Sequence, residues 1–136
     1  MARLVLIVAG AASVLTGAWM FLSPGSFYDV VATFPPRNDH FVRDIGSFNV
    51  ALGAAALYAA PRPAWHAPML GVLTVQYGLH TVSHLIDIDG GEPEAIGVVN
   101  FVLLLVATLV IGAVALRARA RPGTPSDSAS EPRARA

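Results

Sequence analysis

Four long apolar runs constrain this chain more than any other feature of its sequence. They cover residues 4–22, 41–60, 67–86 and 95–116, and each approaches the roughly 20 residues that a helix needs to cross a lipid bilayer. Charged residues make up only 13% of the chain, against about 25% in soluble domains. We therefore predict an all-α protein, a four-transmembrane-helix bundle formed by residues 1–116. The second run is the weakest, because its uncharged part covers only residues 45–60.

The segment after the last run has a different composition. Residues 117–136 are rich in proline, serine, alanine and arginine and contain too few apolar residues to form a core. We predict that this segment is a disordered tail on the cytoplasmic side of the membrane.

Arginines predict the orientation of the chain, because short cytoplasmic loops are enriched in basic residues. One set of helix ends carries five of them: Arg3, Arg62, Arg117, Arg119 and Arg121. The opposite set carries only Arg37 and Arg43. We therefore expect a multi-pass protein of the inner (plasma) membrane with both termini in the cytoplasm and the acidic segment 87–94 outside.

The first apolar run also raises the alternative of a cleaved signal peptide. It is longer than the 7–15 residues of a usual signal-peptide core, and the sequence SPGS that follows lacks an A-x-A cleavage site. We expect the run to be retained as a membrane span.

Polar side chains recur along one stripe of the third run. Gln76, His80, Ser83 and Asp87 follow one another at helical spacing, and His84 lies one turn beyond His80. A membrane helix keeps such groups away from lipid, because an unpaired charge there is unfavourable by roughly 2.5–3.5 kcal/mol. The stripe is therefore expected to face protein or water.

The short linker PRPAWH predicts that the second and third runs form an antiparallel hairpin. Counting back from it at about 1.5 Å per residue places Arg43 and Asp44 at the depth of the histidines. We expect Asp44 to pair with His84 or His80, and Arg43 to pair with Asp87. Arg43, Asp44, Gln76, His80, His84 and Asp87 form the predicted polar cluster. The sequence also contains Asn49 and Asn100, which we expect to bond across helices; Asn49 points about 120° away from Arg43 and is not required in that cluster.

Small residues indicate where helices approach closely in lipid. They recur every four residues in the first run, at Ala9, Ser13 and Gly17. In the second run the same spacing is found at four positions, Ser47, Ala51, Ala55 and Ala59.

Two motifs carry a resemblance to known proteins: HFVRDIG at the head of the second run and QYGLHTVSHLID at the end of the third. Together they resemble small uncharacterised bacterial four-helix integral membrane proteins, loosely DoxX-like. In that group an Arg-Asp-apolar-Gly helix start is matched by a His-x-x-x-His-Leu-x-Asp helix end. The resemblance covers residues 4–116 and implies an architecture, because the group has no settled activity.

The polar cluster admits several functions. Its histidines are either hydrogen-bonded struts, ligands of a metal or haem, or parts of a proton relay or a site for a polar lipid head or quinone. We expect a small-ligand-binding or membrane-complex partner module without a cofactor. The alternative is a membrane redox or metal/haem-dependent enzyme component that uses His80 and His84. The expected partners are the lipid bilayer and either a membrane protein or a second copy of the chain; no basic aromatic face for nucleic acid is found.

Overall fold

The computed structural model describes residues 1–120 of the chain. These residues form five helices and no strand: α1 (Ala2–Leu22), α2 (Pro24–Val30), α3 (Asp39–Ala59), α4 (Pro63–Ile86) and α5 (Ala95–Arg119). The predicted all-α class is confirmed. The predicted tail lies largely outside the described residues, and α5 continues past residue 116 to Arg119.

Three helix boundaries have a simple local cause. Pro24 restricts Ser23, whose φ of −140° and ψ of 65° end α1, and it then serves as the first residue of α2. Pro63 begins α4 in the same way. Asn38 caps α3, since its side-chain Oδ1 accepts a hydrogen bond of 3.1 Å from the backbone N–H of Phe41.

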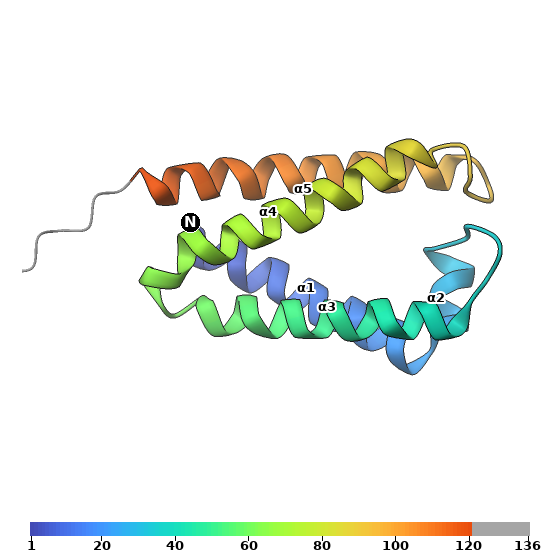
Figure 1. Ribbon diagram of the computed structural model, residues 1–136, viewed down its shortest axis with the longest axis horizontal. Coiled ribbons are helices and arrows are strands. Elements are labelled where there is room, and N and C mark those ends of the chain that lie inside the picture. The colour runs from blue at the N-terminus through green and yellow to red at the C-terminus, as the bar shows by residue number, and fades with distance from the viewer. Residues whose placement is uncertain (121–136) are drawn as a thin grey trace, which may run out of the picture.

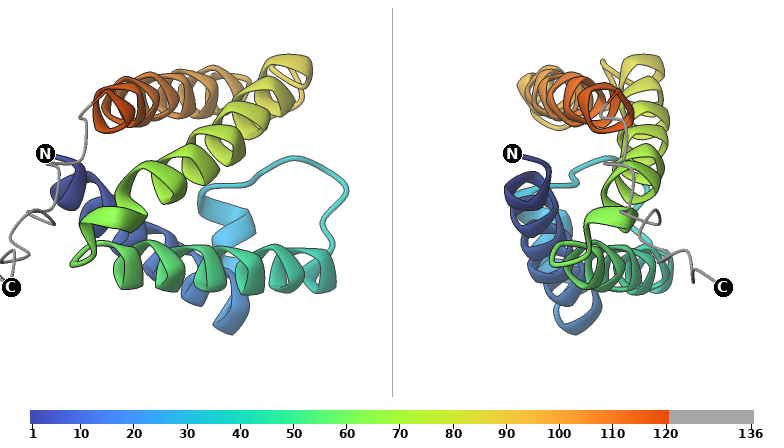
Figure 2. Two further views of the ribbon diagram at one scale, coloured as in Figure 1. Left: turned by 60° about the vertical axis from the view of Figure 1, so that its left-hand side comes forward. Right: turned by 90° about the vertical axis from the view of Figure 1, so that its left-hand side faces the viewer.

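The four long helices are arranged as two pairs (Figure 1). α1 lies along α3, and α4 lies along α5. The α3–α4 turn joins the pairs at the end of the molecule that also holds the N-terminus, which we name the turn end. We name the opposite end the loop end. There α4 lies apart from α3, and α2 and the loops 31–38 and 87–94 are found at this end (Figures 1 and 2). α3 and α4 thus run antiparallel from a short turn, as predicted, but they diverge from it, and each packs along another helix.

Glycines bring α1 and α3 into close contact. A Cβ atom on Gly10 would lie 2.9 Å from the carbonyl oxygen of Gly53, so the two backbones touch there. Ala9, Ser13 and Gly17 of α1 are buried, as expected for a contact face. Of the expected stripe on α3, Ala59 is buried, whereas Ser47, Ala51 and Ala55 are exposed. The contact face of α3 is instead marked by Gly46 and Gly53, both buried.

Two clusters of buried apolar residues hold the pairs together. The larger lies at the turn end, where Leu6 of α1, Ala56 of α3, and Leu70 and Leu73 of α4 are fully buried. A smaller cluster at the loop end contains Met20, Phe27 and Val42, from α1, α2 and α3. The tight packing at the turn end and the divergence beyond it leave space between the pairs toward the loop end.

Two helices are long and apolar enough to cross a membrane. They are α1, with a mean hydropathy of 2.1, and α5, with a mean hydropathy of 2.7. The corresponding first and fourth predicted spans thus have the required length and composition. α3 and α4 are of similar length but fall below the same hydropathy measure.

Candidate functional site

Two cavities lie between the helix pairs. The middle cavity has a volume of about 370 Å³ and is lined by residues from all five helices. The end cavity, of about 330 Å³, lies nearer the loops and is lined by residues of α1 to α4 and of loop 31–38. Five residues line both cavities: Met20, Phe27, Ala32, Ile45 and His84. The two spaces therefore adjoin, and His84 is the one imidazole common to them.

The polar stripe of α4 faces these cavities. Gln76, His80 and His84 are spaced by four residues and line the middle cavity, while Ser83 and Asp87 line the end cavity beside His84. The ring centroids of His80 and His84 are 5.0 Å apart, at an interplanar angle of 45°. Sequence spacing alone placed these side chains on one stripe, and the divergence of the helix pairs leaves that stripe facing a cavity.

The opposite wall explains why the predicted ion pairs do not form. Phe41, Val42 and Ile45 of α3 line the end cavity across from His84. The next positions on the helix, Arg43 and Asp44, are exposed. Along the helix axis they are level with the histidines of α4, as predicted from the residue count. They lie on another face of α3, however, because adjacent helical residues diverge by about 100°.

Asp44 has a different partner from the one expected. Its Oδ2 lies 3.5 Å from Nε2 of His40, one turn earlier on the same exposed face. Among residues 1–120, no ion pair joins Asp44 to His84 or Arg43 to Asp87. Asp44 is not paired with His80 among these residues either, so the predicted pairings of Asp44 and of Arg43 are wrong. Neither Arg43 nor Asp44 lines a cavity.

Two asparagines outside the predicted polar cluster line the middle cavity. Asn49 donates from Nδ2 to the sulfur of Met20 at 3.6 Å and to its own helix at the carbonyl of Ile45. Asn100 donates from Nδ2 to the backbone carbonyl of Val31 at 3.1 Å. Both therefore bond across elements as expected, yet both also line the cavity with His80. The spacing of Asn49 from Phe41 and Ile45 is the signal that would have placed it there.

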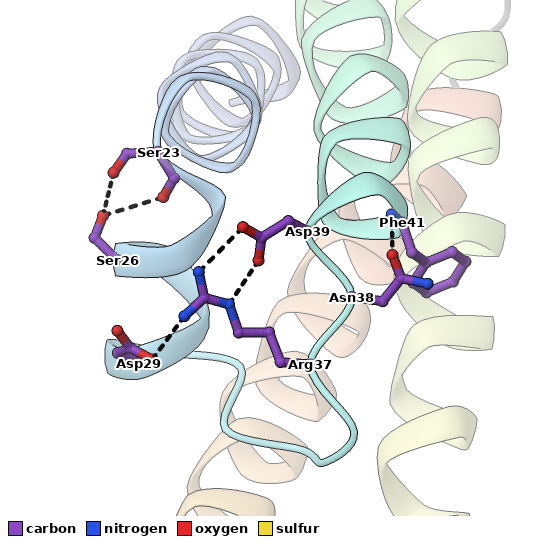
Figure 3. A network of polar contacts seen from close by, with 7 residues as sticks. All are labelled: Ser23, Ser26, Asp29, Arg37, Asn38, Asp39 and Phe41. Atoms are coloured by element: carbon purple, nitrogen blue, oxygen red, sulfur yellow. Dashed lines mark hydrogen bonds and ion pairs between the residues drawn. The ribbon is translucent and has the colours of Figure 1, made fainter.

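A network of polar contacts fixes the loop beside the end cavity (Figure 3). Arg37 donates from Nε and Nη2 to the carboxylate of Asp39 at 2.6 and 3.0 Å, and its Nη1 lies 3.7 Å from Oδ1 of Asp29. The bidentate hydrogen bond from Arg37 lowers the pKa of Asp39 below its ordinary value. Phe34, Pro36 and Asn38 of the same loop region line the end cavity. The network thus connects α2, the loop and the start of α3 at that wall.

The site does not gather the ligands of a metal centre. Within residues 1–120, no group of three or more His, Cys, Asp or Glu side chains is arranged to hold a metal ion. His80 and His84 provide two imidazoles, whereas protein zinc sites use three or four ligands. The donor set of the described residues therefore does not fit a zinc centre.

The chain belongs to a family that is known from sequence comparison. Residues 1–116 match the family described as Domain of unknown function (DUF4345), and the chain is a member of it. The match gives no support to the DoxX part of the resemblance. No curated protein and no solved structure matches the chain.

Proposed function

We propose that this protein crosses the membrane four times and binds a small, largely apolar ligand between its two helix pairs. α1 and α5 have the composition of spans. α3 and α4 present large apolar side chains outward: Phe48 is 75% exposed and Leu79 is 66% exposed. Surfaces of this kind are unfavourable in water and match a lipid environment. All four long helices are therefore assigned to the bilayer.

The orientation follows from charge at the two ends. Arg3, Arg62, Arg117 and Arg119 belong to the N-terminus, the α3–α4 turn and the end of α5, which lie together at the turn end (Figure 1). Basic residues favour the cytoplasmic side. In this arrangement the protein lies in the plasma membrane with both termini in the cytoplasm. The end cavity, beside the loops, then lies toward the outer surface of the bilayer.

The observation that carries the ligand proposal is the make-up of the middle cavity. Its wall combines apolar side chains such as Leu52, Leu103 and Leu104 with the amides and imidazoles of Asn49 and His80. Ligand sites in proteins are cavities of roughly 300–1,000 Å³ with mostly apolar walls and a few convergent polar groups. The middle cavity has that size and that composition.

Cavity-filling variants on α1 test this function. Thr16 lines the middle cavity, whereas its neighbour Leu15 is 71% exposed and lines neither cavity. Protein purified in mild detergent should release a small organic molecule on solvent extraction, measured by mass spectrometry. Thr16→Trp should abolish this release, and Leu15→Trp, the matched control, should leave it unchanged. Equal release from both variants, or none from the parent protein, would refute the ligand proposal.

A further inference from the structure

The class of ligand can be narrowed by the charges around the two cavities; this step rests on the proposed function. Among the described residues, neither cavity is lined by lysine or arginine. The middle cavity is lined by no carboxylate, and Asp87 is the one acidic residue of the end cavity. A buried anionic headgroup would therefore have no fixed cation to offset its loss of hydration. The occupant that fits this wall is uncharged.

The hydrogen-bonding state of His84 indicates which polar group the ligand carries. Nδ1 of His84 is buried and has no hydrogen-bond partner among the described residues. Unpaired buried acceptors are tolerated better than unpaired buried N–H groups, so the proton of the neutral ring is assigned to Nε2. Among the described residues, Nδ1 is the one nitrogen of the His84 ring that is both buried and without a partner; Nε2 is not in this state. His84 thus presents an N–H donor at the junction of the two cavities.

We propose that the joined cavities bind an uncharged, membrane-soluble carbonyl compound, and that His84 donates a hydrogen bond from Nε2 to its carbonyl oxygen. The apolar side chains shared by the two cavities, Met20, Phe27 and Ile45, surround this position. They accommodate the hydrocarbon part of the molecule on either side of the polar contact. Quinones with an alkyl chain have this chemistry.

The chain contains an internal reporter for such a ligand. Its two tryptophans lie at opposite ends, and Trp19 contacts Phe27 with a centroid distance of 5.4 Å and an edge-to-face geometry. Phe27 lines both cavities. In a Trp65→Phe background, the remaining fluorescence comes from Trp19 alone. A decyl-substituted benzoquinone, which quenches indole fluorescence, is the probe.

We expect saturable quenching of Trp19 by this quinone in detergent micelles. A long-chain ketone should reverse the quenching. An alkane of equal length should do so at least about fivefold less effectively, because it lacks the hydrogen bond. Dodecanoate should also compete less well than the ketone, because its charge would be buried without a cation. If dodecanoate competes better than the ketone, the uncharged class is wrong. If the alkane competes as well as the ketone, the hydrogen bond is wrong.

Variants of His84 localise the contact. His84→Leu should weaken quinone binding at least about fivefold, and His84→Gln, which keeps an N–H donor, should restore part of the affinity. His40→Leu is the matched control, because His40 is exposed and lines neither cavity. Equal affinity in all three variants would overturn the role of His84. If the quinone does not bind while the Thr16 experiment still yields an extracted molecule, this inference fails and the proposed function stands.

Discussion

The carbonyl oxygens of Gly17 in α1 and Gly46 in α3 each fill the space that a side chain on the other glycine would need. A Cβ atom on Gly17 would lie 2.6 Å from the carbonyl oxygen of Gly46, and a Cβ atom on Gly46 would lie 2.8 Å from the carbonyl oxygen of Gly17. Atoms do not approach so closely without displacement of a backbone. The pairing of α1 with α3 thus depends on the absence of two methyl groups.

Gly17→Ala should therefore destabilise the protein by about 1–3 kcal/mol, the usual effect of overpacking a close contact. Gly78→Ala is the matched control, since a Cβ atom there would meet only Cγ2 of Thr108 at 3.8 Å. That control should be neutral or stabilising by up to about 1 kcal/mol, because alanine has the higher helix propensity. Unfolding in detergent, followed by circular dichroism, measures both. Equal stability of the two variants would contradict the close contact.

The exposed position of Asp44 predicts that it does not interact with His84. A double-mutant cycle of Asp44→Asn and His84→Gln should be additive within about 0.5 kcal/mol. The positive control is the pair Thr81 and Thr108, whose hydroxyl oxygens are 3.0 Å apart between α4 and α5. Replacing these two by valine should show a coupling of about 0.5–1 kcal/mol.

Both cycles are read from the free energy of unfolding in the same detergent. A coupling between Asp44 and His84 as large as that of the threonines would mean that α3 is rotated from the orientation described above. It would also mean that Arg43 and Asp44 line the cavity with the histidines, as the sequence predicted.

The loop network predicts a dependence of stability on acid pH. The hydrogen bond from Arg37 lowers the pKa of Asp39 in the folded state. Its contribution is therefore fully present above the pKa of an unfolded aspartate, about 3.9, and is lost as the pH falls through the lower folded value. The melting temperature of the parent protein should exceed that of Arg37→Gln at pH 6, and this difference should shrink below about pH 4. A difference that stays constant with pH would show that the pair does not contribute.

Local signals in the sequence were sufficient for part of this structure. Apolar runs bounded by prolines predicted the long helices, and the four-residue spacing of Gln76, His80 and His84 predicted their common stripe. The short helix α2, which lies between the first two predicted spans, was not predicted, although Pro24 is well suited to start a helix.

The orientation of α3 could not be derived in the same way. This helix carries small residues on two faces, one with Gly46 and Gly53 and one with Ser47, Ala51 and Ala55. Its partner α1 selects the glycine face, which permits the closer backbone contact, and this choice turns Arg43 and Asp44 outward. The choice depends on the fit between two helices, a tertiary property that helical spacing within one segment does not contain. The place of Asn49 in the middle cavity was missed for the same reason.

The most direct test of the account is the side of the membrane on which the α3–α4 turn lies. The chain has no cysteine, so single cysteines can be introduced at Ala64, exposed just after the turn, and at Asp89, exposed in the α4–α5 loop. Gly91 is unsuitable, because a Cβ atom there would lie 2.9 Å from the backbone nitrogen of Gly97. Both variants are treated with a membrane-impermeant maleimide in spheroplasts, and permeabilised cells give the maximum labelling. With four spans, Asp89→Cys reacts in intact spheroplasts and Ala64→Cys reacts only after permeabilisation. Labelling of Ala64→Cys in intact spheroplasts to the same extent as Asp89→Cys would mean that only α1 and α5 cross the membrane, and it would contradict the four-span account.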